Sequence, residues 1–175
     1  MSRSPKGAPR STRAYLGLGS NLGDREESLR RAMRLLERGS FAVDRVSSVY
    51  ESEPVGPVAG QPLFLNCVAR GSYGGSARDL LRLIGRVERA LGRVRAEPKG
   101  PRTIDVDILY FGESVIEEPP RLVVPHPAIP ERRFVLLPLA EIDPDLIHPA
   151  IGKTQSELLA ETRDPSRVIP VRRGP

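Results

Sequence analysis

The stretch GPRTIDVDILYF, residues 100–111, decides which fold is predicted for this chain. Its second half is rich in Ile, Val, Leu, Tyr and Phe, a composition typical of a buried strand. Side chains alternate between the two faces of a strand, so Asp105 and Asp107 share one face and the aliphatic residues share the other. Like charges on one face repel, and we therefore expect either a positive partner between them or a face open to water.

Five further elements are predicted on the N-terminal side of this strand. Apolar alternation predicts strands at residues 14–19, 41–52 and 63–73, and helical spacing with capping residues predicts helices at residues 24–39 and 76–91. The order is strand, helix, strand, strand, helix, strand. This order predicts an α+β fold, an α/β sandwich with a ferredoxin-like βαββαβ core, in which an antiparallel sheet has both helices packed on one face.

The rest of the chain is predicted to add to this core. Beyond residue 112 the sequence predicts a hairpin at residues 113–116, a Pro-rich loop, and two short helices at residues 134–141 and 154–159. The only internal repeat is the strand-helix-strand order that occurs twice in the core, and no linker divides the chain into two domains. A single domain is therefore predicted for residues 14–162, with C-terminal additions to the core.

Composition limits the class of protein. The chain has 175 residues, of which 39% are hydrophobic and 28% are charged, and this matches one soluble globular domain. No apolar run approaches the length of a membrane span, and the N-terminal residues lack the apolar stretch of a secretory signal. The single cysteine, Cys67, excludes an internal disulfide and a cysteine-based zinc site. We therefore expect a cytoplasmic protein with no membrane partner.

The net charge of +5 is concentrated at the ends of the chain. Residues 1–13 carry four basic and no acidic side chains, residues 163–175 carry four basic and one acidic, and residues 14–162 therefore have a net charge of −2. Both ends are rich in Pro, Ser and Arg and are predicted to be disordered basic tails. With four Phe, four Tyr and no Trp, the chain also has few side chains for base stacking. We expect no nucleic-acid partner.

The second predicted helix carries one carboxylate in an unusual place. A stripe of arginines opposes its apolar face, but Glu88 falls within the apolar arc. A carboxylate there needs a partner, since burying it alone costs several kcal/mol. An internal arginine and a bound ligand are equally good candidates for that partner.

The surroundings of the aspartate pair indicate phosphate chemistry. The simplest alternative is a half-exposed strand with one polar face. However, Arg102 stands directly before the strand, and Arg93 and Arg95 lie in the preceding loop. Paired carboxylates are hard oxygen ligands suited to magnesium, and arginines match phosphate oxygens, so the set indicates a magnesium-bound nucleotide. Residues 17–23, GLGSNLG, have neither dinucleotide-binding nor P-loop spacing, so any ATP site belongs to neither of those families.

Six blocks of sequence together resemble one enzyme family. In order they are GLGSNLGD (residues 17–24), SSVYESEPVG (47–56), FLNCV (64–68), GRVR (92–95), GPRTIDVDIL (100–109) and VPHPAIPERRFVLLPLAEI (124–142). From about residue 14 to residue 159, the chain is similar to the 6-hydroxymethyl-7,8-dihydropterin pyrophosphokinases of folate biosynthesis. The resemblance implies a ferredoxin-like fold and transfer of the β,γ-pyrophosphoryl group of ATP to the pterin hydroxymethyl group, giving AMP. We expect small-molecule substrates and a monomer.

The resemblance implies roles for the residues at matching positions. Asp105 and Asp107 would bind two magnesium ions together with ATP, and Arg93 and Arg102 would neutralise charge during the transfer. The positions expected to contact the nucleotide and its phosphates are Glu88, Arg95, Ile108, His126 and Arg132.

A second set of matching positions is implied for the pterin. Asn66 would read the ring edge, which suits an amide with its paired donor and acceptor. Phe64 and Phe134 would stack on the two ring faces. One loop would add backbone hydrogen bonds, at positions Ser52, Val55 and Gly56.

Several alternatives stay open beside this resemblance. The loop at residues 96–99 is shorter than in many relatives, and His148 is expected at the surface with no role. An RNA-binding module on the same fold would need exposed aromatic residues on the central strands. A different ATP-dependent transferase would keep the aspartates and arginines but lose the set of Phe64, Asn66 and Phe134.

Overall fold

The computed structural model describes residues 11–55, 60–93 and 100–172 of the chain. Two predicted site positions, Gly56 and Arg95, lie outside these residues, as does the short loop at residues 96–99. Within the described part, no helix combines the length and the apolar character that crossing a bilayer requires.

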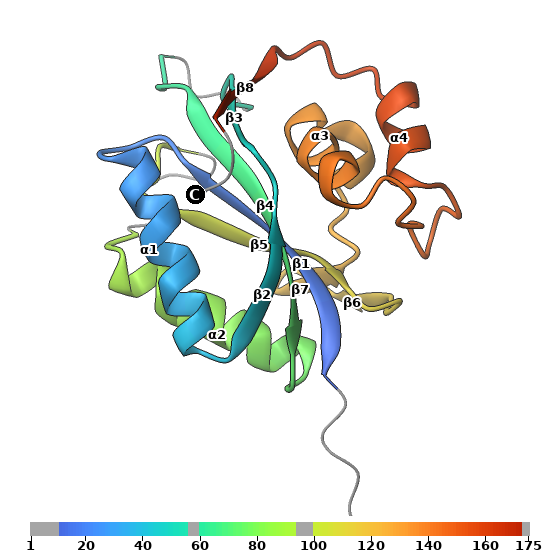
Figure 1. The fold of residues 1–175 in the computed structure, drawn as a ribbon, viewed down its shortest axis with the longest axis horizontal. Coiled ribbons are helices and arrows are strands. Elements are labelled where there is room, and N and C mark those ends of the chain that lie inside the picture. Colours follow the sequence, from blue (N-terminus) through green and yellow to red (C-terminus); the bar gives the residue numbers. More distant parts are fainter. Residues whose placement is uncertain (1–10, 56–59, 94–99, 173–175) are drawn as a thin grey trace, which may run out of the picture.

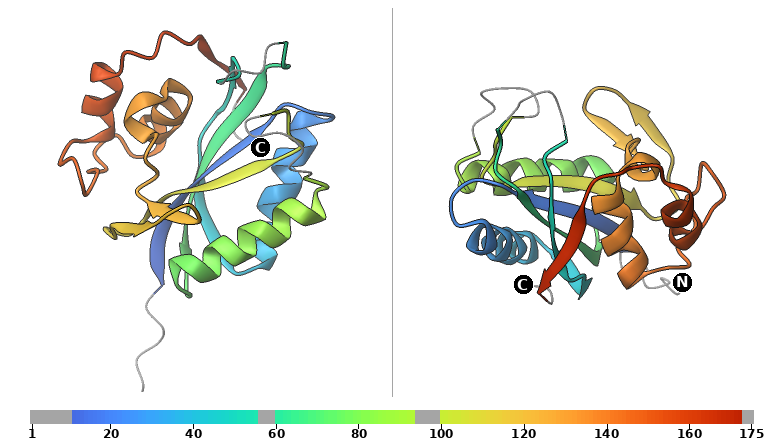
Figure 2. Two further views of the ribbon diagram at one scale, coloured as in Figure 1. Left: turned by 180° about the vertical axis from the view of Figure 1, so that it is seen from behind. Right: turned by 90° about the horizontal axis from the view of Figure 1, so that it is seen from above.

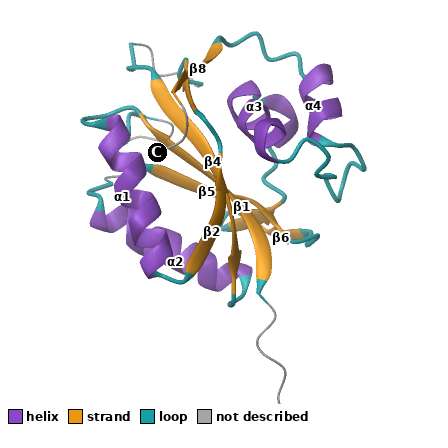
Figure 3. Cartoon of the chain, in the orientation of Figure 1, coloured by secondary structure: helices purple, strands orange, loops and turns teal. Residues whose placement is uncertain are grey.

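A six-stranded sheet forms the centre of the molecule (Figures 1 and 3). Its strands follow the order β5-β1-β4-β3-β8, β2 also pairs with β4, and every pairing is antiparallel. The predicted ferredoxin-like order is confirmed, with β8 added at one edge. The strands are β1 Thr12–Ser20, β2 Phe41–Val46, β3 Val49–Ser52, β4 Phe64–Tyr73, β5 Asp105–Phe111 and β8 Val168–Arg172, and a separate hairpin consists of β6 Ile116–Glu118 and β7 Leu122–Val124.

Helices cover both faces of the sheet (Figure 2). The two core helices α1 and α2 lie side by side on one face, as predicted, and α3 and α4 lie on the other. The helices are α1 Arg25–Arg38, α2 Ala77–Ala90, α3 Arg133–Ile142 and α4 Gln155–Glu161, and a short 3₁₀ turn, η1 Ile129–Glu131, precedes α3.

Capping residues explain where the core helices begin and end. Asp24 accepts a hydrogen bond from a backbone N–H three residues later, at 3.0 Å, and starts α1. Ser76 and Asp79 form a reciprocal capping box at the start of α2. These side chains satisfy N–H groups that the first helical turn leaves free. Gly39 ends α1 against α2, where a Cβ atom would lie only 2.2 Å from Leu83 Cδ1.

Each face of the sheet has its own apolar core. Beneath α1 and α2 the buried side chains include Leu16, Leu18 and Leu80. Beneath α3 and α4 they include Tyr110 of β5 and Leu136 of α3. Part of this second face is left uncovered by α3 and α4, and a cavity opens there.

The second predicted strand, residues 41–52, is broken into β2 and β3. At the break, the buried Ser47 hydroxyl accepts a hydrogen bond from the Val68 N–H at 2.9 Å. The Ser48 N–H donates to the Glu141 carboxylate on α3 at 3.0 Å. Side chains therefore take over the hydrogen bonding at the break, and β2 and β3 pair with different parts of β4.

The prediction of a disordered C-terminal tail at residues 163–175 is wrong in part. Residues 168–172 form β8, and Val168 pairs opposite Ser52 of β3. Apolar residues in this segment can add to an open sheet edge, and Pro170 is tolerated because an edge strand need not donate every N–H. The predicted hairpin also lies later in the chain than expected, where β6 and β7 pair.

Candidate active site

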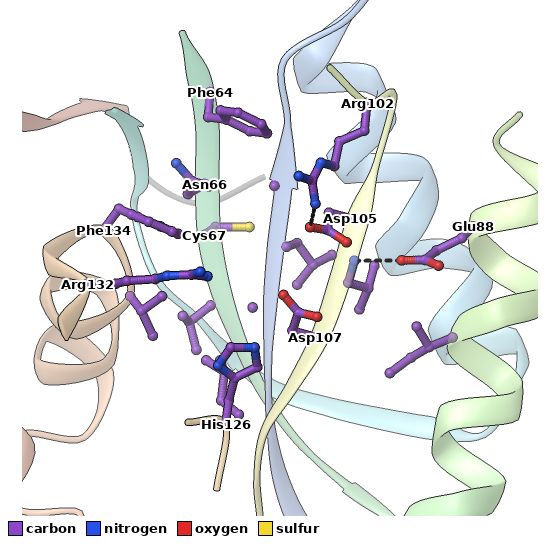
Figure 4. Close-up of a pocket in the computed structure, with 18 of the residues that line it drawn as sticks. Phe64, Asn66, Cys67, Glu88, Arg102, Asp105, Asp107, His126, Arg132 and Phe134 are labelled. Carbon is purple, nitrogen blue, oxygen red and sulfur yellow. Dashed lines mark hydrogen bonds and ion pairs between the residues drawn. The ribbon is translucent and has the colours of Figure 1, made fainter. Parts of the chain in front are cut away.

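A cavity of about 690 Å³ opens on the sheet face that α3 partly covers (Figure 4). Strands β1, β4 and β5 form its floor, and it extends past the edge strand β5 to α2. Twelve of the fifteen predicted site residues line it. Of the other three, Gly56 and Arg95 lie outside the described residues, and Ile108 is placed elsewhere.

The structure does not bring the Ile108 side chain to the cavity. This side chain is 5% exposed and packs in the core beneath α1 and α2. Strand alternation requires this placement, because the preceding Asp107 faces the cavity. Only the backbone of Ile108 is available for a contact with a nucleotide.

The floor beneath the two aspartates is made of glycine. In the register of β1 and β5, Gly17 lies opposite Asp107 and Gly19 lies opposite Asp105. Gly19 also lies opposite Asn66 on β4, and a Cβ atom added to it would lie 2.9 Å from Asn66 Oδ1. A Cβ atom added to Gly17 would lie 3.4 Å from Leu109 Cδ2, so glycine at both positions lets neighbouring side chains approach the β1 backbone closely.

Asp105 lies at the centre of an ion-pair network. Its carboxylate pairs with Arg102 and, at 2.6 Å, with Arg93. Arg93 also pairs with Glu88 of α2. All four side chains are at most 20% exposed, so these pairs are screened by water less than surface pairs are. The positive partner that we expected from the sequence is therefore present for Asp105 and consists of two arginines.

Glu88 connects α2 to β5. Its Oε1 accepts a hydrogen bond from the backbone N–H of Val106 at 3.0 Å (Figure 4). Burial raises the pKa of Glu88, and the Val106 N–H and the Arg93 guanidinium counteract that rise. Of the two partners that the sequence left open, the internal arginine is present, and the side chain still lines the cavity.

Asp107 is a buried carboxyl among other negative charges. Burial raises the pKa of this carboxyl, the charges of Asp105 and Glu88 raise it further, and Arg93 and Arg132 oppose them. Within the described residues, no group of three or more His, Cys, Asp or Glu is placed to hold a metal. A pair of carboxylates suits a cation that takes its other oxygen ligands from water and phosphate, as magnesium does. The donor set therefore fits magnesium bound together with a polyphosphate.

His126 and Arg132 enter the cavity from the α3 side (Figure 4). Nδ1 of His126 accepts a hydrogen bond from the Ala128 N–H at 3.2 Å, so the proton of the neutral ring is on Nε2. Burial and the charge of Arg132 lower the pKa of His126, which is therefore neutral at pH 7. A neutral imidazole with Nε2–H can donate one hydrogen bond to a ligand.

The predicted pterin-binding residues gather at the end of the cavity near β3. Asn66 is 6% exposed, and its Nδ2 donates a hydrogen bond to the Ser52 hydroxyl at 2.9 Å. Phe64 and Phe134 point into the cavity with Asn66 between them in the view of Figure 4. Both rings are half-buried, so neither is a fully enclosed core side chain. Val55 lies at the rim and is 46% exposed.

An arginine lies over each of the two phenyl rings. The Arg102 guanidinium lies 5.8 Å from the centroid of Phe64, and that of Arg132 lies 5.7 Å from the centroid of Phe134. Such cation–π contacts hold both partners in place. Since Arg102 also pairs with Asp105, the aromatic and carboxylate parts of the cavity are physically connected.

Among the lining residues that were not predicted from the sequence, two glycines and an arginine bear on ligand binding. Gly17 and Gly19 form its floor, and Arg121 of the β6–β7 turn adds another guanidinium. The alternation Leu-Gly-Leu-Gly at residues 16–19 was the signal for the glycines, because apolar residues on one face imply an empty opposite face. Arg121 carried no comparable signal, since a lone arginine in a Pro-rich loop is usually solvated.

Comparison with known proteins identifies the family. Residues 15–144 match the family model of the 7,8-dihydro-6-hydroxymethylpterin-pyrophosphokinases (HPPK). The chain belongs to this family. The predicted HPPK resemblance is thus confirmed, and with it the activity, that of a pyrophosphokinase of folate biosynthesis. All fifteen predicted site positions fall within the matched residues.

Bacterial HPPK relatives cover most of the chain. The 2-amino-4-hydroxy-6-hydroxymethyldihydropteridine pyrophosphokinase of Bacillus subtilis is 48% identical over 130 residues, which are 74% of this chain and 77% of that protein. The protein of the same name from Pseudomonas aeruginosa is 44% identical over 149 residues, which are 85% of this chain and 90% of that protein.

A solved structure shares the HPPK fold. The crystal structure of wild-type Plasmodium falciparum HPPK-DHPS matches with a TM-score of 0.68 and 15% sequence identity over 89% of this chain. At that identity the likeness concerns the fold alone. This chain spans 45% of the length of that protein.

Proposed function

We propose that this chain moves the β,γ-pyrophosphoryl group of ATP to the hydroxymethyl group of 6-hydroxymethyl-7,8-dihydropterin and releases AMP. The observation that carries the proposal is that one cavity joins the carboxylates of Asp105 and Asp107 to the set of Phe64, Asn66 and Phe134. The charged end fits a nucleotide polyphosphate, and the aromatic end fits a flat heteroaromatic ring. The pterin hydroxyl and the phosphates can then meet between the two ends.

Asp105 and Asp107 are the residues that would hold two magnesium ions. Their oxygen donors suit this cation, and the negative charge gathered around Asp107 favours a divalent partner. Bound magnesium supplies charge neutralisation and Lewis-acid polarisation of the phosphate oxygens. Glycine at positions 17 and 19 places no side chain opposite either carboxylate.

The arginines would supply the fixed positive charge. Arg93 and Arg102 are held at the cavity by their pairs with Asp105, and a polyphosphate competes with that carboxylate for both guanidinium groups. Preorganised cations stabilise charge that develops on the departing AMP without reorganisation of solvent. Arg132 and the Nε2–H of His126 would bind nucleotide oxygens.

The pterin end would hold the acceptor hydroxyl in line for attack. Ser52 accepts one N–H of the Asn66 amide, which orients the Oδ1 and the second N–H for a ligand. The two phenyl rings would stack on the pterin faces. Positioning and electrostatics, rather than covalent catalysis, would then carry the reaction.

Calorimetric titration with 6-hydroxymethyl-7,8-dihydropterin, with and without magnesium and a non-hydrolysable ATP analogue, tests this proposal. We expect pterin binding that is coupled to the nucleotide and hardly responds to salt. Indifference to the pterin with retained nucleotide binding contradicts the proposal and favours another ATP-dependent transferase. Binding of RNA that weakens steeply with salt would indicate a nucleic-acid-binding module instead.

The proposal includes a monomeric enzyme. All groups invoked for the reaction come from one chain, and none requires a second copy. Light scattering coupled to size-exclusion chromatography, at the concentration of the activity assay, checks this point. A stable dimer under those conditions would contradict it.

A further inference from the structure

The start of α3 carries two proposed site residues but has no cap of its own. Arg132 occupies the N-cap position, and its side chain makes no capping hydrogen bond. A guanidinium has N–H donors and no acceptor, so it cannot satisfy the free N–H groups of a helix start. Phe134 lies two residues further on, in the first turn.

Asp164 supplies the missing cap from the segment that follows α4. Its Oδ2 accepts a hydrogen bond from the backbone N–H of Arg133, the first residue of α3, at 2.7 Å. Its Oδ1 accepts one from the Ser166 N–H at 2.9 Å, which fixes the carboxylate. Burial acts to raise the pKa of Asp164, but the hydrogen bonds from Arg133 and Ser166 lower it. The carboxylate is therefore ionised at a helix N-terminus, where negative charge is favourable.

The backbone segment that Asp164 holds also positions the side chains of Arg132 and Phe134. Arg133 stands between Arg132 and Phe134, which line the cavity while Arg133 does not. The Arg132 guanidinium lies 5.7 Å from the centroid of the Phe134 ring, so the two side chains are coupled to each other. Fraying of this first turn would displace both of them at once.

The same segment also connects to the opposite side of the pterin end. Two residues after Ser166 it becomes β8, and Val168 pairs opposite Ser52 of β3. Ser52 in turn orients the amide of Asn66. The chain from Asp164 to β8 therefore runs from the first turn of α3 to the sheet edge that carries Ser52 (Figure 1).

We infer that Asp164 is a positioning residue for this reaction: it caps α3 and thereby holds Arg132 and Phe134 in their binding positions, without touching a substrate. The inference rests on the proposed roles of those two residues. Losing a helix cap changes a local equilibrium by about fivefold. Asp164→Ala is therefore expected to raise the KM for both substrates by about fivefold and to leave kcat within about twofold, because the lost contacts serve binding in ground state and transition state alike.

Steady-state kinetics of three full-length variants tests this inference. Asp164→Asn keeps a side-chain oxygen acceptor, and Asn is a good N-cap residue, so this variant is expected to recover most of the wild-type KM. Asp145→Ala removes the same charge from an exposed position in the same part of the chain and is expected to change neither constant. Wild-type KM values in Asp164→Ala, or equal losses in Asp164→Ala and Asp145→Ala, would overturn the inference.

A double-substitution cycle keeps the test decisive if Asp164→Ala also lowers the melting temperature. Dihydropterin affinity is measured by calorimetry for Phe134→Ala with and without Asp164→Ala. If Asp164 acts through the first turn of α3, the second substitution adds less than about twofold once the phenyl ring is gone. A full additive loss overturns the inference. Failure of the wild-type chain to bind the dihydropterin would instead contradict the proposed function itself.

Discussion

The two faces of the central sheet are built by the same strands but follow opposite rules. On β1, Leu16 and Leu18 point into the core beneath α1 and α2, whereas Gly17 and Gly19 point into the cavity. On β5, Val106 and Ile108 belong to that core, while both aspartates face the cavity. The first face is filled with side chains throughout, whereas the second is filled beneath α3 and α4 and left open beside the charged groups of the cavity. Folding and chemistry therefore depend on different residues of the same strand, because successive side chains point to opposite faces of the sheet.

The largest effect on activity is expected for substitution of Asp107 on the cavity face. Asp107→Ala should lower kcat/KM by about 100- to 1000-fold at saturating magnesium and ATP, because it removes a group that organises charge in the transition state. The melting temperature should not fall, since Asp105 and Glu88 repel the buried Asp107 carboxylate. AMP production and thermal unfolding of the same sample measure both effects.

Asp44→Ala is the matched control for this prediction, because Asp44 pairs with Arg70 at a site where it is 47% exposed. It should leave turnover unchanged. Near wild-type turnover in Asp107→Ala would remove this residue from the proposed metal site.

The converse effect, on stability rather than on activity, is expected at Leu16, which is next to Gly17 in sequence but does not line the cavity. Leu16 is 0% exposed, and Leu16→Ala should lower the free energy of unfolding by about 3 kcal/mol through lost burial and a cavity. The KM for either substrate should stay within about twofold of wild type under conditions where the variant is folded. Urea denaturation and kinetics test the two halves of this prediction, and a large KM change at full folding would contradict the separation of the two faces.

A smaller effect on activity is expected when a methyl group is added to the cavity face at Gly19. Gly19→Ala places a Cβ atom 2.9 Å from Asn66 Oδ1 and should raise the KM for the dihydropterin by about tenfold, by displacing the amide. Gly74→Ala is the control, because a Cβ atom there meets nothing within 4 Å. If the two variants have the same KM, the glycine floor does not define the pterin end.

The smallest effect is expected where α3 and α4 cover the cavity-side face and make it a core. His148 is 5% exposed, packs edge-on against Tyr110, and accepts a hydrogen bond from the Ala150 N–H through Nδ1. Burial lowers the pKa of His148 below the ordinary histidine value of 6.5, so the unfolded chain binds the proton more readily. The contribution of neutral His148 to the free energy of unfolding is therefore complete above about pH 6.5, and it declines as the pH falls below that value.

Melting temperatures at pH 7 and pH 5 test this contribution. The wild-type chain should lose more stability between these two values than His148→Gln does. Equal losses would show that His148 is not a buried neutral group in solution.

The sequence predicted the core of the fold well because the signals were local. Alternation defined the strands, and capping residues such as Asp24 and Ser76 defined the helix starts. β8 was missed because its pairing partner is remote in sequence and its composition is that of a tail. His148 was expected at the surface but is buried, since a polar residue beside proline gives no sign of the helices that will pack over it.

The candidate site shows the same division. The aspartate pair and Glu88 were found because a charge in an apolar pattern is itself a signal. That Arg93 bridges Glu88 and Asp105 was not predicted, because it depends on how α2 docks beside β5. The capping role of Asp164 was missed for the same reason, since its partner lies 31 residues earlier in the chain.

The glycine floor has a consequence for inhibitors. A compound that rests on Gly17 and Gly19 contacts main-chain atoms, so the chain has no side chain there to shorten in order to weaken the compound. Substitution can only add atoms, and an added Cβ on Gly19 meets Asn66, which the natural substrate is proposed to need. A substitution at these positions that weakens inhibitor binding is therefore expected to impair binding of the natural substrate as well.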